Sequence, residues 1–325
     1  MDRKQFLKTM LAGAAAPVLS SCADNGGGEL PKSKYILWKR INLKVGLEKP
    51  ARIVHISDTH FCFADARDDR RKRDLAKQRE RIFCGKNMPP DKSPLTRNLY
   101  EAIDYANKSG ALVVYTGDLI DFTSKLNFEL GRRALARCDN YIMAVGNHDF
   151  CQYIGDSPED EAYKARSAAE VRKMAGHDIA FASRVFGGVN VVSIDNNYYR
   201  FTEDAAAKLE REVAKGLPIV LAMHIPLYTK EFYEYAMSST RGGCALLIDV
   251  PGALLAAYTN EARRIEQTPD KPTKEFVKYL KAQPLVKAVL CGHFHSEVSD
   301  RLFGDTMQYC VGATGRNLAQ EFVIT

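Results

Sequence analysis

Residues 51–60 read ARIVHISDTH, a short apolar run rich in β-branched residues that stops abruptly at Asp58 and His60. Outward from this segment, five further runs of similar length and composition recur along the chain. Short and continuously apolar segments are typical of strands that are buried on both faces. The sequence therefore predicts the central strands of a layered α/β protein. The six runs are Ala51–Ser57, Ala111–Thr116, Tyr141–Val145, Val189–Ile194, Pro218–Met223 and Val286–Cys291.

Helical patterns lie between these predicted strands. Apolar residues at three- and four-residue spacing predict helices over Thr96–Ser109, Thr202–Lys215 and Thr273–Lys281. Thr202 is expected to cap the second of these helices, which ends before a glycine.

Two stretches do not fit the alternation of strands and helices. Residues 64–92 are densely charged, and residues 228–268 are aromatic at first and then small and apolar. Long insertions at strand ends often shape a substrate site. A solvated charged helix is an equally good interpretation of the first stretch, and a packing segment of the second, so both interpretations stay open.

Five of the predicted strands end in residues that carry chemistry. In open α/β sheets, ligands bind beyond the carboxyl ends of the strands. Five of the seven histidines lie in these strand-end segments, a grouping that scattered core or surface histidines would have no reason to form. The sequence therefore predicts one site built from five strand ends. The segments are Asp58–His60, Gly117–Asp121, Gly146–Asp149, His224 and Gly292–His295.

The spacing within these segments predicts how the side chains face. Asp58 and His60 stand two residues apart in chain that is expected to be extended, so both side chains face the same side. His293 and His295 share this spacing and can straddle two metal ions. Glycines before three of the polar residues permit tight turns and close backbone approach. Carboxylate, imidazole and amide oxygen together suit divalent Zn, Fe or Mn.

The motifs D-x-H, G-D-x-x-D, G-N-H-D, an isolated His shortly before Pro226 and G-H-x-H follow one another from Asp58 to His295. Single motifs of this kind are common, but the full ordered set resembles the calcineurin-like metallophosphoesterase superfamily. The resemblance implies an α/β fold, a layered α-β-β-α sandwich with two central mixed sheets.

The resemblance also implies a centre of two divalent metal ions, either Mn, Fe or Zn. Asp118 would bridge both ions with its carboxylate. The other ligands would be Asp58, His60 and His295 for the first ion, and Asn147, His224 and His293 for the second.

Three further residues receive roles from the same resemblance. His148 would face the substrate, Asp149 would orient His148 through a hydrogen bond, and Asp121 would support the ligands from behind. The implied reaction is hydrolysis of phosphate mono- or diesters by a hydroxide that bridges the metals, with His148 assisting the leaving group. No tyrosine stands at or near Asp121, which disfavours the purple acid phosphatase branch.

Two other functions stay open at this point. A catalytically silent metal-binding scaffold could share the fold, although such relatives usually lose ligands that this chain retains. A nuclease would use the basic run at 70–73. The net charge of +6, of which +4 remains beyond the first 21 residues, is too mild to favour nucleic acid. We expect a small phosphoester as substrate and predict no protein partner.

The N-terminal residues are predicted to be a targeting segment. Three basic residues among the first eight precede an apolar run at 10–19 that is too short to span a bilayer. The run ends in LSSC at 19–22, which resembles the lipobox of bacterial lipoproteins. We therefore expect a signal peptide at 1–21, lipid on Cys22, a tether at 22–33 and one domain at 34–325. The protein would be lipid-anchored in the bacterial cell envelope, facing the periplasm or the exterior; a plain secretory signal or an uncleaved anchor is the alternative.

Further polar residues lie near the predicted site or within the core. Asn196 follows a strand end and could line the site, and Arg241 and Arg316 stand beside glycines and could contact a phosphate. Solvated arginines are the alternative for the last two. His55, inside a strand, is expected to be a structural core histidine, and His177 a surface or capping residue. The eight cysteines show no CxxC spacing, and small buried side chains are expected.

Overall fold

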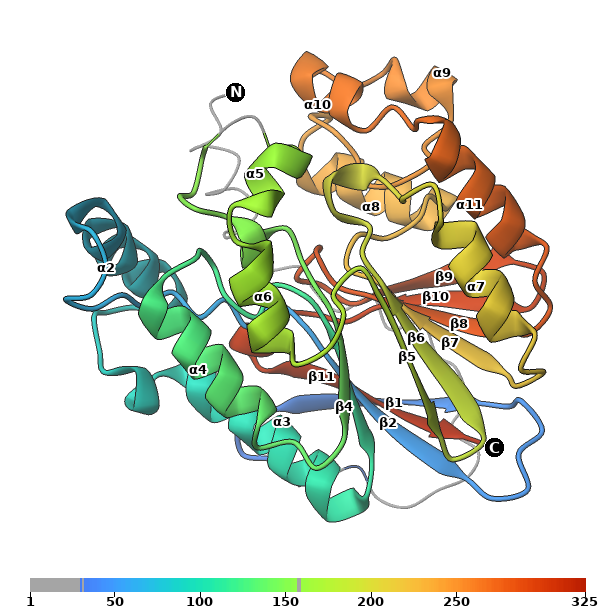
Figure 1. The fold of residues 1–325 in the computed structure, drawn as a ribbon, viewed down its shortest axis with the longest axis horizontal. Helices are drawn as coiled ribbons and strands as arrows, with labels where there is room; N and C mark the ends of the chain where they lie inside the picture. The colour runs from blue at the N-terminus through green and yellow to red at the C-terminus, as the bar shows by residue number, and fades with distance from the viewer. Residues whose placement is uncertain (1–29, 31, 157–158) are drawn as a thin grey trace.

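The strands form two mixed sheets in the computed structural model, which describes residues 30, 32–156 and 159–325 (Figure 1). The predicted signal peptide and Cys22 lie outside these residues. Within the first sheet only β11 and β2 are antiparallel neighbours. Its order is β1 (Leu37–Leu43), β11 (Leu318–Ile324), β2 (Ala51–Ile56), β3 (Leu112–Thr116) and β4 (Tyr141–Ala144).

The second sheet has parallel inner pairs and one antiparallel pair at each edge. Two mixed sheets are the arrangement that the sequence predicts. The order is β5 (Phe181–Phe186), β6 (Val189–Ile194), β7 (Ile219–Ala222), β8 (Val286–Cys291), β10 (Thr306–Cys310) and β9 (Val298–Phe303).

The sheets pack face to face because their central strands are apolar on both sides. In β3, Leu112 and Val114 enter a core between the sheets, together with Val220 from β7. Val113 and Tyr115 of the same strand point the other way, into a core shared with helices. Since side chains alternate across a strand, a strand without a polar face needs cover on both sides.

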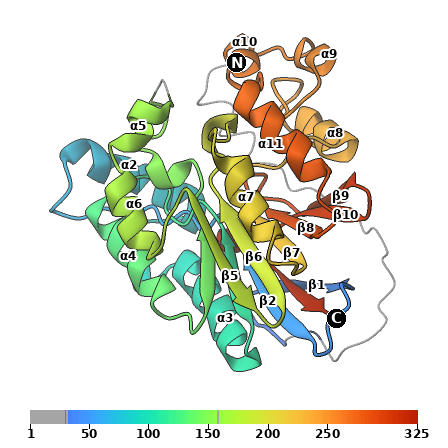
Figure 2. The ribbon, with the colours of Figure 1, turned by 45° about the vertical axis from the view of Figure 1, so that its right-hand side comes forward.

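Helices provide that cover on both outer faces, which confirms the α-β-β-α order (Figures 1 and 2). On the side of the first sheet lie α2 (Arg70–Cys84), α3 (Pro94–Ser109), α4 (Lys125–Leu135), α5 (Glu161–Ala165) and α6 (Ala168–Ala175). On the side of the second sheet lie α7 (Ala205–Val213), α8 (Lys230–Ser239), α9 (Gly252–Leu255), α10 (Glu261–Glu266) and α11 (Lys271–Lys281). None of the helices within the described residues has the length and hydropathy needed to cross a bilayer.

The six predicted strands are all present, with ends within one residue of those predicted. The three predicted helices are also present, as α3, α7 and α11. Thr202 is not the cap of α7, because the helix begins later, at Ala205, and the Thr202 hydroxyl instead donates to the Asp204 carboxylate at 2.7 Å.

The two insertions lie on opposite sides of the molecule (Figures 1 and 2). Residues 64–92 contain α2, a mostly exposed charged helix whose buried residues are Ala76 and Arg79. Residues 228–268 contain α8, α9 and α10, and Phe232 of this segment packs against Phe294, 5.7 Å between ring centroids. The first insertion is therefore the charged helix, and the second does pack against the core.

Candidate metal centre

The loops that follow β2, β3, β4, β7 and β8 meet at one place between the two sheets and bring all seven predicted metal ligands together. Asp58 and Asp118 leave the first sheet, while His224 and His293 leave the second. Asp58, Asp118 and His224 are buried, and His293 is partly buried. The carboxyl ends of parallel strands thus deliver the ligands to one edge, as expected for this class of sheet.

Five of the seven predicted ligands have positive φ angles, a conformation that non-glycine residues rarely adopt. Such strain costs about 1–3 kcal/mol per residue and is concentrated at functional sites. The prediction that Asp58 and His60 lie in extended chain is therefore wrong. Hydrogen bonds from their amides to Gly117 O and Asp118 O, at 2.9 and 3.0 Å, hold this loop against the next one. The five angles are 54° for Asp58, 55° for His60, 56° for Asp118, 73° for His293 and 55° for His295.

Two glycines are required by the close approach of these loops. A Cβ on Gly146 would lie 2.1 Å from Oδ1 of Asp118, and a Cβ on Gly292 would lie 2.5 Å from Oδ2 of Asp58. Both distances are too short for any side chain, so each glycine leaves room for one carboxylate of the site.

Each of the two carboxylates has one oxygen fixed by the backbone and one facing imidazoles. Asp118 Oδ1 accepts from the His148 amide at 2.8 Å, while its Oδ2 lies 3.2 Å from His224 Nε2 and 3.7 Å from His60 Nε2. Asp58 Oδ2 accepts from the His293 amide at 3.1 Å. Asp118 therefore presents one free oxygen between imidazoles of the two sheets.

The ligand atoms form two groups that share Asp118. In each group they lie within 4.8 Å of one another. In the first group His60 Nε2 and His295 Nε2 are 2.9 Å apart, and in the second His293 Nδ1 is 3.2 Å from His224 Nε2. The first group is Asp58, His60, Asp118 and His295, and the second is Asp118, His224 and His293.

Two buried oxygens support the view that these groups bind cations. Asp58 Oδ1 and Asn147 Oδ1 lie within the site and accept no hydrogen bond. Burial raises the pKa of Asp58, but His295 and His60 outweigh it and hold the pKa well below its ordinary value. An ionised carboxylate and an amide oxygen without donors, beside clustered imidazoles, are the chemistry of a divalent metal site.

Partners behind the imidazoles set which ring nitrogen is free. His60 Nδ1 lies 3.1 Å from Asp121 Oδ1, and His224 Nδ1 lies 2.7 Å from Thr116 O. An Nδ1–H that donates to such an oxygen leaves Nε2 with its lone pair toward the site. Both rings are therefore oriented as metal ligands.

His148 lines the pocket in front of the ligands, with 17% of its side chain exposed. Its Nδ1 donates to Asp121 O at 2.9 Å and lies 3.2 Å from Asp121 Oδ1. Burial lowers the pKa of His148, but Asp118 and Asp121 outweigh it and raise the pKa to about 9. His148 thus faces the pocket. It lies outside the two groups that share Asp118 and forms a third group of potential ligand atoms with His60 and Asp121.

Asp149 does not take the place that the sequence predicts for it. Its carboxylate accepts from the amides of Gly146, Asp118 and Ile120, at 2.8 to 3.1 Å, and it is fully buried. Burial and the nearby Asp118 raise the pKa of Asp149 to about 7. The orienting contact of His148 comes from Asp121 instead, because the short 3₁₀ turn at 148–150 leaves Asp149 bound to amides of its own loop and of the loop after β3.

Arg79 is a residue of the site that the sequence did not single out. Its Nε and Nη2 donate to Oδ2 and Oδ1 of Asp121 at 2.6 and 2.8 Å, and the residue is 5% exposed. The pairing fixes the carboxylate that contacts both His60 and His148. Its position in the helix could have indicated that it is buried, because Arg79 lies on the same helical face as Ala76 and Phe83.

The remaining predicted residues are spread more widely. Asn196 is buried and holds the loop of His224, accepting from the amides of His224 and Ile225 at 3.3 and 3.1 Å. Arg241 is exposed in the turn after α8 and does not line the pocket. Burial lowers the pKa of Arg316 and Asp58 opposes that shift, which places this guanidinium within electrostatic reach of the site.

Histidines outside the site have structural contacts. His55 lies between Gln320 and Thr116 at 3.1 and 2.9 Å, and burial lowers its pKa to about 3, so it is the neutral core histidine that we expected. His177 Nε2 accepts from the Met143 amide at 3.1 Å. The cysteines within the described residues all have free thiols, and most are buried.

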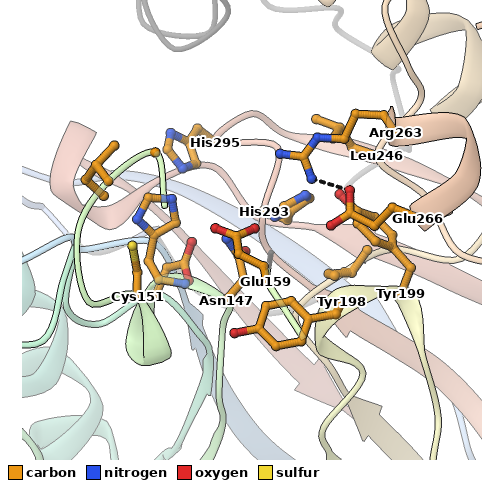
Figure 3. A pocket seen from close by; sticks show the side chains of 15 residues that line it. Asn147, Cys151, Glu159, Tyr198, Tyr199, Leu246, Arg263, Glu266, His293 and His295 are labelled. Carbon is orange, nitrogen blue, oxygen red and sulfur yellow. Dashed lines mark hydrogen bonds and ion pairs between the residues drawn. The ribbon is translucent and has the colours of Figure 1, made fainter. Parts of the chain in front are cut away.

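The pocket in front of the ligands has a volume of about 840 Å³ that includes its open mouth. Figure 3 shows His293 and His295 on the side of the candidate metal ligands, with Tyr198, Tyr199 and Leu246 among the residues around it. Arg263 and Glu266 of α10 complete the side beside His293. The second insertion therefore reaches the pocket as well as packing on the core.

Comparison with known proteins agrees with this arrangement. The model of the calcineurin-like phosphoesterase family matches residues 51–297. The chain therefore belongs to the calcineurin-like phosphoesterase family. No protein with a curated description matches the sequence.

Several solved structures are similar to this chain at low sequence identity. A dimetal phosphatase from Danio rerio is 11% identical, with 83% of this chain and 91% of that chain covered and a TM-score of 0.46. The calcineurin-like phosphoesterase YfkN from Bacillus subtilis is 12% identical, with 82% of each chain covered and a TM-score of 0.43. A purple acid phosphatase from yellow lupin is 13% identical, with 83% of this chain and 45% of that chain covered and a TM-score of 0.44.

Proposed function

We propose that this chain hydrolyses phosphate mono- or diesters at a centre of two divalent metal ions. The observation that carries the proposal is the carboxylate of Asp118. Its Oδ2 lies between His224 Nε2 and His60 Nε2, and so it belongs to both groups of ligand atoms. A single carboxylate shared by two clusters is the arrangement that holds two cations close together.

The residues present fit Mn, Fe or Zn, because the ligands are imidazoles, carboxylates and one amide oxygen. Two such ions would lower the pKa of bound water and neutralise charge on the phosphoryl group. Asp58 and Asp118 hold their positions through backbone amides, and Asp121 and Thr116 O orient His60 and His224.

His148 is the group that we assign to the leaving oxygen. Its Nδ1 is held by Asp121 O, so its Nε2 is free to point into the pocket and to donate a proton to the departing alkoxide. Its side chain is mostly buried, with 17% exposed to the pocket.

The test of the proposal is hydrolysis of p-nitrophenyl phosphate and bis(p-nitrophenyl) phosphate by protein loaded with Mn²⁺. We expect turnover of at least one ester, its loss on chelation and its recovery when metal is restored. Two bound ions per chain should be measured by elemental analysis, and Asp118→Asn should lower that number. Metal-loaded protein that hydrolyses neither ester would contradict the proposal and favour a silent metal-binding scaffold.

His148→Ala separates the metal centre from the leaving-group role. We expect two ions per chain as in the wild type and a kcat about 10²- to 10⁴-fold lower, the usual contribution of a positioned proton donor. His177→Gln is the matched control, because this histidine binds the Met143 amide away from the pocket. Unchanged kcat in His148→Ala would sink the assignment.

We also propose that the chain is exported and anchored by lipid on Cys22. The support is the LSSC segment at 19–22 behind a short apolar run and a basic N-terminus. Metabolic labelling of full-length protein with a fatty acid should label the wild type and not Cys22→Ala, and only the wild type should sediment with membranes. Equal labelling of both proteins would refute the anchor.

A further inference from the structure

The pocket has a wall beyond the metal-binding side chains that the proposed chemistry does not use. Tyr199, Leu246, Arg263 and Glu266 line it there, and Figure 3 shows the last two beside His293. If the phosphoryl group occupies the ligand side, the alcohol portion of the ester, which begins at the oxygen assigned to His148, can extend along this wall. The second insertion, which supplies three of these four residues, is thus placed to select the alcohol.

The charged groups of this wall form a compact pair. Arg263 Nη1 donates to Glu266 Oε2 at 2.5 Å, and the two side chains are 20% and 23% exposed. Glu159 also lines the pocket. Burial lowers the pKa of Arg263, but Tyr199, Glu266 and Glu159 outweigh it and raise the pKa. Arg263, Glu266 and Glu159 thus place two carboxylates and one guanidinium on this side of the pocket.

This charge pattern discriminates between classes of alcohol. A second phosphate, as in a nucleoside diphosphate, would be attracted by the guanidinium of Arg263 but repelled by the carboxylates of Glu266 and Glu159. Hydroxyl groups both donate and accept, so neighbouring hydroxyls can accept from the guanidinium and donate to the carboxylate beside it. Leu246 and Tyr199 supply apolar surface for the carbon side of such a molecule.

We propose that the pocket accepts a phosphate ester of a polyol, such as a sugar phosphate, whose neighbouring hydroxyls are held by Arg263 and Glu266. This inference rests on the proposed hydrolysis of phosphate esters at the metal-binding side chains. It adds the class of the alcohol and two residues that determine specificity.

The first experiment compares substrates on Mn²⁺-loaded wild-type protein. We expect kcat/KM for a hexose phosphate to exceed that for phosphocholine and for a nucleoside diphosphate by at least about tenfold, the effect of one added hydrogen bond to a charged group. Equal or better turnover of either competitor overturns the inference. If p-nitrophenyl phosphate and its diester are not hydrolysed either, it is the proposed function that fails.

The second experiment uses Arg263→Ala and the near-isosteric Glu266→Gln. We expect KM for the hexose phosphate to rise about 10- to 100-fold in Arg263→Ala and less in Glu266→Gln. The hydrolysis of p-nitrophenyl phosphate, which has no hydroxyls to bind, should change by less than about twofold. Arg264→Ala is the matched control, since Arg264 lies on the same helix, does not line the pocket and pairs with Glu261 at 3.0 Å.

A binding measurement separates recognition from turnover. The His148→Ala protein, loaded with Mn²⁺, is titrated with the hexose phosphate in a calorimeter, alone and combined with Arg263→Ala. We expect the second change to weaken Kd by about tenfold or more. An unchanged Kd, or equal losses with the hexose and the p-nitrophenyl ester, would show that Arg263 does not select the polyol.

Discussion

Two insertions bring one arginine each to the candidate metal centre or to the pocket in front of it, and the two arginines lie in opposite settings. Arg79 of α2 lies behind the ligands, with 6% of its side chain exposed, and donates to both oxygens of Asp121. Arg263 of α10 lies in front, lines the pocket and donates to one oxygen of Glu266. Arg79 therefore supports the ligand arrangement that acts on every substrate. Arg263 can contact only the part of a substrate that enters the pocket.

The difference teaches how inserted segments act on a shared site. A buried, bidentate ion pair fixes positions, and removing one partner leaves a buried charge without compensation. A pair at a pocket wall with about one-fifth of its side chains exposed can contact a ligand that enters the pocket. Changes in the first insertion should therefore alter kcat and stability for all substrates, and changes in the second should alter KM for the preferred one.

Arg79→Ala is expected to have the largest effect. Asp121 would lose its partner and release both His60 and His148, so kcat should fall about 10- to 100-fold for every ester, with weaker Mn²⁺ binding. The free energy of unfolding should fall by about 3–5 kcal/mol. The measurements are kcat on two unrelated esters, Mn²⁺ titration and denaturant unfolding.

If Arg79→Ala lowers the turnover of one ester and leaves that of another unchanged, Arg79 does not support the site for every substrate. Arg71→Ala is the control on the same helix, because Arg71 is exposed and pairs with Asp156 at 3.0 Å. We expect that variant to keep the kcat and the stability of the wild type.

Glu321→Gln removes a buried ion pair away from the site. It tests whether a loss of stability is enough by itself to lower turnover. Glu321 is buried within the first sheet and accepts from Arg40, Arg52 and Tyr105 at 2.5 to 2.7 Å. We expect the free energy of unfolding to fall by about 1.5–3 kcal/mol, while kcat stays that of the wild type. A large loss of kcat would mean that stability and turnover cannot be separated in this protein.

The same glutamate predicts a pH dependence of stability. Burial raises the pKa of Glu321, but Tyr105, Arg40 and Arg52 outweigh it and lower the pKa below its ordinary value. A lowered folded-state pKa means that this stabilisation is present above about pH 4.3, the pKa in the unfolded chain, and is lost as the pH falls. The difference in the free energy of unfolding between the wild type and Glu321→Gln should thus shrink as the pH is lowered from 7 to 3.

The sequence predicted the central strands and the ligands because both follow from short-range patterns. Each run such as Val286–Cys291 is apolar on both faces, and each ligand follows a strand end within four residues. The strands that were missed lack this pattern. In β11, Gln320 and Glu321 are buried only because His55 and two arginines on other strands satisfy them.

The two arginines were missed because their roles depend on contacts distant in sequence. Arg79 reaches Asp121 across 42 positions, and among the arginines of a charged helix only the fold shows which one is buried. Arg263 is brought to the pocket by a segment with no strand of its own, while Arg241, which the sequence favoured, remains outside. Asp149 was misassigned for a related reason, since one turn of the backbone decides which neighbour it contacts.

The exchange Arg79→Lys sharpens the comparison with a smaller change. A lysine keeps the charge but cannot donate to both oxygens of Asp121 in the planar geometry of a guanidinium. We expect kcat to recover most of the loss seen in Arg79→Ala and to stay up to about tenfold below the wild type, as for one lost charged hydrogen bond. If the kcat of Arg79→Lys is no higher than that of Arg79→Ala, the charge alone contributes nothing to turnover. The planar, two-point contact would then be the whole contribution of Arg79 to kcat.

The smallest effect is expected for the coupling between the two arginines. Arg79 contacts Asp121 and Phe83, whereas Arg263 contacts Glu266, so the two share no partner among these contacts. Losses in kcat/KM for a hexose phosphate should therefore add in the double variant Arg79→Ala/Arg263→Ala, with a coupling energy below about 0.5 kcal/mol. A larger coupling energy would mean that a change at Arg79, behind the ligands, alters the pocket wall at Arg263. The two arginines would then not have separate roles in supporting the ligands and selecting the substrate.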